Sequence, residues 1–221
     1  MLLILGQRAK ASAERIYEIL DEPPAVDDRH DAVDLFPLGG SISFSDVSFA
    51  YGTEAVGGSQ GNEKAPLVLN NFNLDVLPGE TIAIVGRTGS GKSTIARLLM
   101  RFYELQGGSI SLDGHDIRSV TQTSLRSAIS LVPDEPFLFS TSVHENISYG
   151  KPGASREEVE AAARAAQAHE FIVGLDDGYD TVVGERGYDL SGGQRQRISL
   201  ARLFLSDPSV IILDDSTSAI D

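Results

Sequence analysis

The chain has 221 residues, of which 41% are hydrophobic and 23% are charged, a balance typical of a globular fold rather than of a disordered or fibrous chain. Its 18 Lys and Arg residues against 32 Asp and Glu residues give a net charge of −14 at pH 7. Nucleic acid is therefore disfavoured as a partner, because binding to a phosphate backbone needs a basic surface. The sequence contains no cysteine, which excludes disulfides and thiolate metal sites.

A helix followed by a linker is expected at the start of the chain. Over residues 7–20 the apolar residues recur at the spacing of one helical face. Pro23 and Pro24 then end the helix, because proline lacks the N–H group and restricts the residue before it. We therefore assign residues 1–22 to the helix, and the acidic residues 23–40, which contain Pro and Gly, to a linker.

Alternating apolar residues predict strands in the next part of the chain. The alternation over residues 42–49 changes phase near Asp46, which indicates a strand with a bulge. A second alternation covers residues 72–76. Asp113 and Gly114 form a residue pair typical of a tight hairpin turn.

Three short apolar runs, at 81–85, 129–132 and 210–213, are typical of strands that are buried on both faces. Helical periodicity covers residues 94–101 and residues 192–205. Because strands alternate with helices, the sequence predicts an α/β fold with a parallel core.

Residues 142–190 carry few strand signals and look like an inserted helical lobe. Ser142 and Ser155 are each followed three residues later by glutamate, which is the pattern of a capping box. We expect helices to begin at both serines.

The loop between the strand at 81–85 and the helix at 94–101 matches G-x-x-x-x-G-K-[ST] in the strand–loop–helix context that this pattern requires. Its backbone N–H groups are expected to surround phosphate oxygens at the positive end of the helix. Lys92 adds a charge for the β- and γ-phosphates, and Ser93 offers a hydroxyl to Mg²⁺. The candidate phosphate-binding residues are Gly86, Arg87, Thr88, Gly89, Ser90, Gly91, Lys92, Ser93 and Thr94.

Asp214 directly follows the apolar run at 210–213. In open α/β sheets, ligands bind at the carboxyl ends of the strands. By itself such an aspartate is as readily a helix cap or a turn residue, but beside a phosphate loop it is a candidate ligand of Mg²⁺, directly or through water.

With these motifs, residues 190–194 make the chain resemble the nucleotide-binding domain of ATP-binding cassette (ABC) transporters. The residues that match the family's signature sequence are Leu190, Ser191, Gly192, Gly193 and Gln194. The resemblance covers nearly the whole chain. It implies a P-loop NTPase core with a parallel sheet, an N-terminal antiparallel β subdomain and an inserted helical subdomain within residues 41–221, with ATP and Mg²⁺ as ligands.

The resemblance also implies roles for single residues. Tyr51 matches the aromatic residue that stacks on adenine. Asp134 stands where the family has the Q-loop glutamine, so it is a candidate catalytic residue and metal ligand. Asp215 stands where the family has the catalytic glutamate, and Lys92 is the third candidate catalytic residue. Residues 218–221 resemble the D-loop, which crosses to a partner domain.

The signature implies a partner. Ser191 and the N–H group of Gly193 lie at the expected start of a helix, which is an anion-binding position. In the family this position binds the γ-phosphate held by a second ABC domain, so that two domains enclose two ATP molecules head to tail.

Other segments resemble those of exporters. Residues 181–187 match a motif found just before the signature in exporters, and the helix near the N-terminus resembles the segment that joins the last membrane helix to this domain. This implies a transmembrane domain before residue 1 and a place on the cytoplasmic face of the plasma membrane. Phe137, Phe139 and Glu185 fall in segments that touch cytoplasmic loops of the membrane domain in the family. Packing within the helical lobe is the alternative for the two phenylalanines.

The sequence departs from the family at the catalytic positions. Asp215 is shorter than glutamate by one bond, about 1.5 Å, and a displacement of about 1 Å costs on the order of a hundredfold in rate. Asp134 replaces an amide by a charge, although Glu135 takes this position if the loop shifts by one residue. The family's switch histidine lies in a loop after the D-loop, and none of His30, His115, His144 and His169 stands at such a place, so we expect the sequence to be a fragment truncated after the D-loop.

An intact signature beside a weakened Asp214–Asp215 pair resembles the half of a heterodimeric exporter that contributes a slow, degenerate ATP site. One alternative is a homodimeric exporter in which Asp215 is a slow base, and another is an ATP-gated scaffold without turnover. A third is a soluble ABC ATPase that acts on DNA or ribosomes. That class needs a basic surface or a coiled-coil insertion before the signature, and the sequence has neither.

Overall fold

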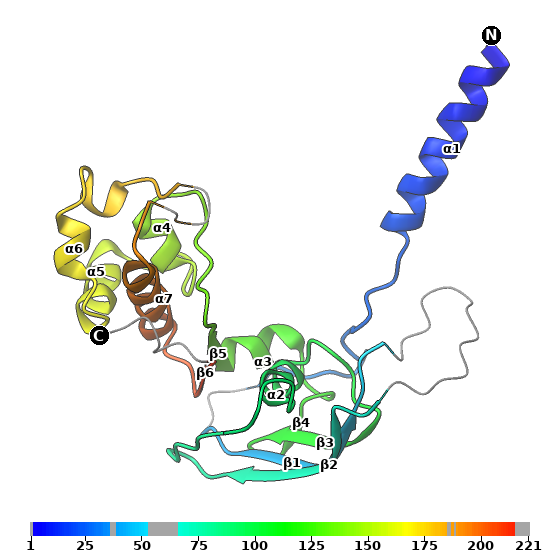
Figure 1. Cartoon of the computed structure of the whole chain (residues 1–221), viewed down its shortest axis with the longest axis horizontal. Coiled ribbons are helices and arrows are strands. Elements are labelled where there is room, and N and C mark those ends of the chain that lie inside the picture. Colours follow the sequence, from blue (N-terminus) through cyan, green and yellow to red (C-terminus); the bar gives the residue numbers. More distant parts are fainter. Residues whose placement is uncertain (1, 36–38, 53–65, 185–186, 188, 215–221) are drawn as a thin grey trace.

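The computed structural model describes residues 2–35, 39–52, 66–184, 187 and 189–214 (Figure 1). The elements follow in the order α1 Leu2–Leu20, β1 Ile42–Phe49, β2 Leu69–Val76, α2 Lys92–Leu99, β3 Gly107–Leu112, β4 His115–Asp116, α3 Gln122–Ala128, β5 Ile129–Val132, α4 Val143–Ser148, α5 Arg156–Ala165, α6 His169–Val173, a 3₁₀ turn at Gly178–Asp180, α7 Gly192–Ser206 and β6 Val210–Leu213. This mixture of an antiparallel sheet, a parallel pair and a group of helices confirms the predicted α/β fold class.

The antiparallel sheet has the strand order β2-β1-β3-β4. Within β1 the pairing shifts between Phe44 and Val47, and Asp46 has a φ of 49°, which confirms the predicted bulge. Because the extra residue restores the side-chain alternation, Phe44 and Val47 both face the core and are 2% and 0% exposed. The bulge therefore lets one strand bury both of its apolar runs on the same face.

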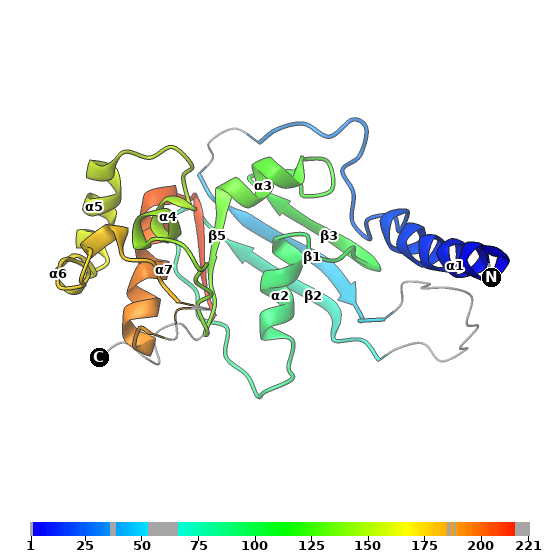
Figure 2. The ribbon, with the colours of Figure 1, turned by 90° about the horizontal axis from the view of Figure 1, so that it is seen from above.

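The parallel pair consists of β5 and β6, in register from Ile129 opposite Val210 to Val132 opposite Leu213. Both strands were expected. In both views α2 and α3 lie over the antiparallel sheet, and α3 is followed directly by β5 of the parallel pair (Figures 1 and 2). One hydrophobic cluster joins Leu98 of α2, Leu125 of α3 and Ile129 of β5 to the sheet, so the first half of the chain shares a single core.

The helices α4 to α7 form a second hydrophobic cluster, which includes Ile147, Ile172 and Ile198. Ser142 and Ser155 accept hydrogen bonds from the N–H groups three residues later, and both capping boxes are complete. The predicted helix starts at these serines are therefore confirmed. The group of helices lies at the end of the molecule opposite α1 (Figure 2).

The strand predicted at residues 81–85 is wrong. These residues belong to neither sheet in the described part of the chain. Ile82 and Ile84 are 38% and 42% exposed, and Val85 is 89% exposed. A strand needs a neighbour for its backbone hydrogen bonds, and a short apolar run shows hydrophobicity without showing whether a neighbour is within reach.

The helix α1 stands clear of the sheets in both views (Figures 1 and 2). Ile16, Tyr17, Ile19 and Leu20 are between 57% and 79% exposed. Among the helices of the described residues, none combines the length and the apolar character that crossing a membrane requires.

The hairpin turn between β3 and β4 also fixes the start of β1. Asp113 and Gly114 have φ values of 47° and 80°, as a tight turn with two left-handed residues requires. The Asp113 carboxylate accepts hydrogen bonds from the N–H groups of Gly40 and Ser41 at 2.9 and 2.8 Å. Burial opposes ionisation, but these hydrogen bonds, with that of the Ser41 hydroxyl, outweigh it and hold the pKa of Asp113 below its usual value.

We expect Asp113→Asn to destabilise the chain by about 1–3 kcal/mol at neutral pH, because Asn tolerates the left-handed backbone but lacks the charged acceptor. The folded-state pKa of Asp113 lies below the unfolded value, so this stability is present above the unfolded pKa and is lost as the pH falls through the folded one. Urea midpoints of wild type and variant should differ at neutral pH and converge in acid. Asp75→Asn, at an exposed position of β2, is the control. A midpoint difference that does not change with pH would contradict the assignment.

Candidate functional site

Residues 86–93 form the turn through which the chain enters α2, and their glycines have the backbone angles that such a turn needs. Gly89 and Gly91 have φ values of 82° and 93°, in the left-handed region that other residues rarely adopt. A Cβ atom on Gly91 would also lie 3.1 Å from Cδ2 of Leu69 on β2. Successive N–H groups in turns of this kind make a concave site for anions, so the loop has the backbone geometry of a phosphate site.

The ammonium group of Lys92 lies against this loop. Its Nζ donates hydrogen bonds to the carbonyl oxygens of Gly86 and Arg87, at 3.0 and 3.1 Å. An ammonium group has three N–H donors, so these two bonds leave a third donor for a phosphate oxygen. The charge is thus held at the loop before any ligand binds.

The helix that carries the loop is firmly packed. Ile95, Leu98 and Leu99 of α2 are 7%, 0% and 4% exposed, while Ser93, in the first turn, is only partly buried. The positive end of a helix favours anions, and here that end is fixed in position by the core behind it.

Tyr51 lies beside this helix, as part of an aromatic cluster. Its hydroxyl is 3.0 Å from Oγ1 of Thr94, and its ring meets those of Phe49 and Tyr103 edge to face at 4.9 and 5.1 Å. The structure therefore brings Tyr51 close to the phosphate-binding residues. Tyr103 was missed by the sequence analysis, and the aromatic pair Phe102-Tyr103 directly after α2 was the available signal.

Asp134 and Asp214 follow the two strands of the parallel pair at the same edge. Asp214 donates its N–H to the carbonyl oxygen of Val132 at 3.0 Å, which fixes its backbone at the end of β5. No hydrogen bond between described residues links Asp214 to the phosphate loop. The candidate catalytic Asp215 lies outside the described residues, as do Glu185 and residues 218–221.

Three of the predicted site residues carry oxygen ligands of the kind that magnesium prefers. Magnesium binds oxygen ligands and usually takes only one or two from the protein, since phosphate oxygens and water complete its shell. Ser93 offers a hydroxyl, and Asp214 and Asp134 offer carboxylates. Among the described residues, no group of three or more His, Cys, Asp or Glu side chains is placed to hold a metal ion.

The second predicted anion-binding position, Ser191 with its neighbours, lies at the start of α7. Ser191 caps this 15-residue helix and accepts a hydrogen bond from the N–H of Gln194 at 3.3 Å, while Gln194 Oε1 accepts one from the N–H of Ser191 at 2.8 Å. Arg195 donates to the carbonyl oxygen of Leu190 at 2.6 Å. The sequence analysis placed a helix start here but missed this capping box, although Ser191 and Gln194 have the required spacing.

A surface cavity of about 690 Å³ lies between the parallel pair and the helical group. Phe137, Phe139 and Tyr149 line it, and Phe137 and Tyr149 are 51% and 61% exposed. The guanidinium of Arg202 lies 5.9 and 5.4 Å from the ring centres of Phe139 and Tyr149, and burial lowers its pKa below the usual value. Exposed aromatic side chains around a cavity are typical of a protein-binding surface.

Comparison with known proteins points to one family. A family model described as ABC transporter matches residues 69–218. The chain is 47% identical over 215 residues to the ATP-dependent lipid A-core flippase of Desulfotalea psychrophila, a match that covers 97% of this chain and 36% of that protein. It is 46% identical over 215 residues to the heavy metal tolerance protein of Schizosaccharomyces pombe, covering 97% of this chain and 25% of that protein.

A solved structure gives the same result. The chain matches the structure of a bacterial Atm1-family ABC exporter with ATP bound, with a TM-score of 0.88 and 40% identity, over 97% of this chain and 36% of that one. The chain therefore spans between a quarter and just over a third of the length of these relatives.

Proposed function

Because this chain belongs to the ABC transporter family, we propose that it binds and hydrolyses ATP with Mg²⁺ and thereby powers export of a substrate across a membrane. The observation that carries this proposal is the loop 86–93, whose left-handed glycines and Lys92 stand at the N-terminus of a packed helix. The names of the relatives, a flippase and an exporter among them, support transport as the process.

Each part of the nucleotide has its own residues in this proposal. Tyr51 stacks on the adenine, and the loop N–H groups with Lys92 bind the phosphates. Ser93 and Asp214, with Asp134 beside them, hold Mg²⁺, which neutralises phosphate charge when bound. Within this site Asp215 orients the attacking water and Lys92 stabilises the charge that develops on the phosphate.

Hydrolysis at this site is proposed to be slow. Asp215 reaches about 1.5 Å less far than glutamate, and Asp134, or Glu135 in a shifted loop, adds negative charge where the family has an amide. The signature is intact, and its capping box holds Ser191 at the start of α7. We therefore propose that Ser191, Gly193 and their neighbours complete the ATP site of a second ABC domain, bound head to tail in a heterodimer.

The remaining parts of the chain are proposed to connect the ATP-binding site to the membrane domain. We propose that residues 1–22 continue from a transmembrane domain, that residues 23–40 are a linker, and that residues 41–221 are the ATP-binding domain, with a helical subdomain at about 142–190. The cavity of Phe137 and Phe139 then receives cytoplasmic loops of the membrane domain. This places the chain on the cytoplasmic face, most simply of the plasma membrane.

We propose that residues outside this ATP-binding region determine which substrate is transported. Two relatives with 47% and 46% identity to this chain carry names of different chemistry, a lipid A-core flippase and a heavy metal tolerance protein. A difference in substrate between proteins with equally similar ATP-binding regions points to residues outside those regions.

Alternatives to the heterodimer are a homodimeric exporter, an ATP-gated scaffold without turnover, and a soluble ABC ATPase. The net charge of −14 disfavours a nucleic-acid-bound ATPase. Reading the sequence before residue 1 separates the transporter from a soluble protein, because only the transporter has membrane helices there.

We expect Lys92→Ala to weaken ATP binding by about ten- to a hundredfold, since a hydrogen bond to a charged group is worth about 1.5–3 kcal/mol. Titration of the full-length protein with a fluorescent ATP analogue measures the effect. Lys151→Ala is the matched control, because Lys151 pairs with Glu158 at 2.6 Å in the helical group. ATP affinity unchanged in both variants would contradict the assignment of the phosphate loop.

The asymmetry is tested by comparing Ser191→Arg with Lys92→Ala in the assembled transporter. Ser191→Arg should abolish most steady-state phosphate release, because it blocks the anion contact that completes the partner's faster site. Lys92→Ala should cost much less, because it acts on the slow site. Ser155→Arg breaks a capping box of the same kind away from any nucleotide and controls for lost helix stability. Equal losses in Ser191→Arg and Lys92→Ala would show that the two sites are equivalent, against the heterodimer.

A further inference from the structure

We propose that Arg101 is a positioning residue that ties the phosphate-loop helix α2 to residues 26–35, so that ATP bound at one end of α2 sets the position of the chain that enters from α1. This inference rests on the proposed function, because it takes ATP as the ligand of the loop and transport as the output.

Arg101 has an unusual position directly after α2. Its φ of 51° is left-handed, a backbone conformation in which glycine or asparagine usually ends a helix. Its side chain is nevertheless 3% exposed. Burial of a charged side chain and a left-handed backbone are both unfavourable, so they require specific partners that stabilise Arg101 in this position.

Two of its four partners lie in the N-terminal segment. Nη2 of Arg101 donates to the carbonyl oxygen of Asp27 at 2.7 Å, and Nη1 lies 3.4 Å from both the Asp28 carboxylate and the carbonyl oxygen of Val120. Nε donates to Glu104 at 3.0 Å. Each nitrogen of the guanidinium therefore has an acceptor, and two of these acceptors belong to residues more than seventy positions earlier in the chain.

The Asp28 carboxylate also binds the start of α3. It accepts hydrogen bonds from the N–H of Gln122 at 3.0 and 3.2 Å, and the Gln122 side chain donates to the carbonyl oxygen of Val26 at 3.3 Å. An acidic side chain at a helix N-terminus is favoured by the helix dipole. Asp28 thus links Arg101, two residues after the end of α2, to Gln122, the first residue of α3.

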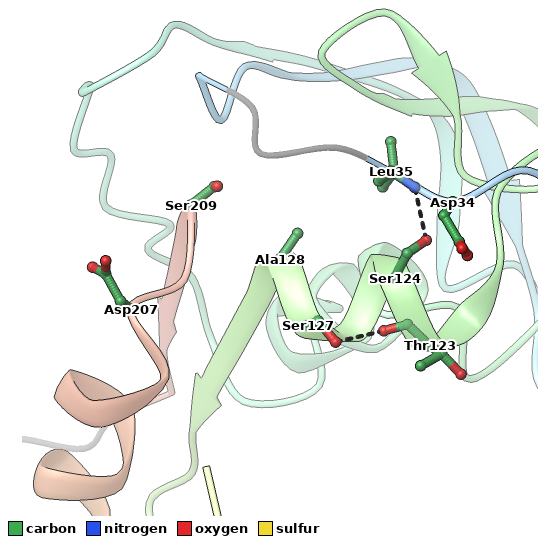
Figure 3. Close-up of a pocket in the computed structure, with 8 residues that line it drawn as sticks. All are labelled: Asp34, Leu35, Thr123, Ser124, Ser127, Ala128, Asp207 and Ser209. Carbon is green, nitrogen blue, oxygen red and sulfur yellow. Dashed lines mark hydrogen bonds between the residues drawn. The ribbon is translucent and has the colours of Figure 1, made fainter. Parts of the chain in front are cut away.

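The same segment continues along α3. Val33 forms a parallel bridge with Val120, and Asp34 accepts a hydrogen bond from the Thr121 hydroxyl at 2.6 Å. The N–H of Leu35 donates to the hydroxyl of Ser124 at 3.0 Å (Figure 3). Residues 26–28 and 33–35 are therefore bonded to the core region, whereas Arg29, His30 and Asp31 between them are exposed.

The other side of the α2 end faces the aromatic cavity. Arg126 of α3 donates to the carbonyl oxygens of Met100 and Arg101 at 3.2 and 3.1 Å, and its guanidinium lies 5.0 Å from the ring centre of Phe102. Met100 and Arg126 line the cavity proposed to receive the membrane domain. The residues that follow α2 thus contact both sides: Arg101 binds the N-terminal segment, and Met100 lines the cavity.

This arrangement makes α2 a rigid connection. It is a short helix with a packed face, so in this proposal a shift of Lys92 on phosphate binding also shifts Arg101. Because two of the four partners of Arg101 are Asp27 and Asp28, that shift reaches the chain leading to α1. This route does not use the aromatic cavity.

The experiment uses the full-length transporter reconstituted in liposomes, with Asp28→Asn and Arg101→Lys as single and double variants. Asp28→Asn keeps the size of a partly exposed side chain and removes its charge, so the fold is retained. Asp31→Asn, at an exposed position of the same segment, is the matched control. The readouts are ATP affinity, substrate transported per ATP hydrolysed, and hydrogen exchange of residues 26–35 with and without ATP.

We expect Asp28→Asn to leave ATP affinity close to wild type, to lower the melting temperature because Arg101 and the N–H of Gln122 lose a charged acceptor, and to lower transport per ATP by about three- to tenfold. ATP should protect residues 26–35 from exchange in wild type and in Asp31→Asn, but not in Asp28→Asn. In transport per ATP, the double variant should be no worse than the more affected single variant, since both changes break the contact between Arg101 and Asp28 through which the coupling is proposed to run.

Unchanged transport per ATP in Asp28→Asn, with faster exchange of residues 26–35, would overturn this proposal, because the pair would then serve stability alone. Absence of any ATP effect on exchange of residues 26–35 in a wild type that binds ATP would also overturn it while leaving the proposed function intact. Failure of the wild type to bind ATP would overturn both.

Discussion

The guanidinium groups of Arg101 and Arg126 hold the C-terminal end of α2 from two sides, while its N-terminal end carries the phosphate loop. Almost everything else in the first half of the molecule depends on this helix keeping its position. The antiparallel sheet provides the core against which α2 packs, and Tyr51 at the end of β1 reaches Thr94 in its first turns. A loop that binds phosphate with backbone N–H groups works only if the helix behind it does not move independently of that core.

The second half of the chain has a separate hydrophobic core, to which α7 with its capped start belongs. The loop 86–93 and Ser191 therefore belong to two differently packed units, joined through β5, β6 and α7. This division agrees with the proposal that the two positions serve different ATP molecules, one held by this chain and one held by its partner.

Features determined by a few neighbouring residues were predictable from the sequence, and features that depend on distant contacts were not. The bulge at Asp46 and the capping boxes at Ser142 and Ser155 follow from local patterns, and the structure confirms them. The strand at residues 81–85 fails because pairing requires a neighbour that no local pattern supplies. The role of Arg101 was invisible for the same reason, since its partner Asp28 lies 73 positions away in a segment that reads as a linker.

The most direct test of the account is where ATP lies on this chain. Full-length protein labelled with 8-azido-ATP and Mg²⁺ under light, then digested and analysed by mass spectrometry, reports which side chains surround the adenine. We expect labelling of the peptide that contains Tyr51, and this labelling should be removed by excess ATP and weakened in Lys92→Ala. Labelling confined to peptides remote from Tyr51 and from the loop 86–93 would contradict it.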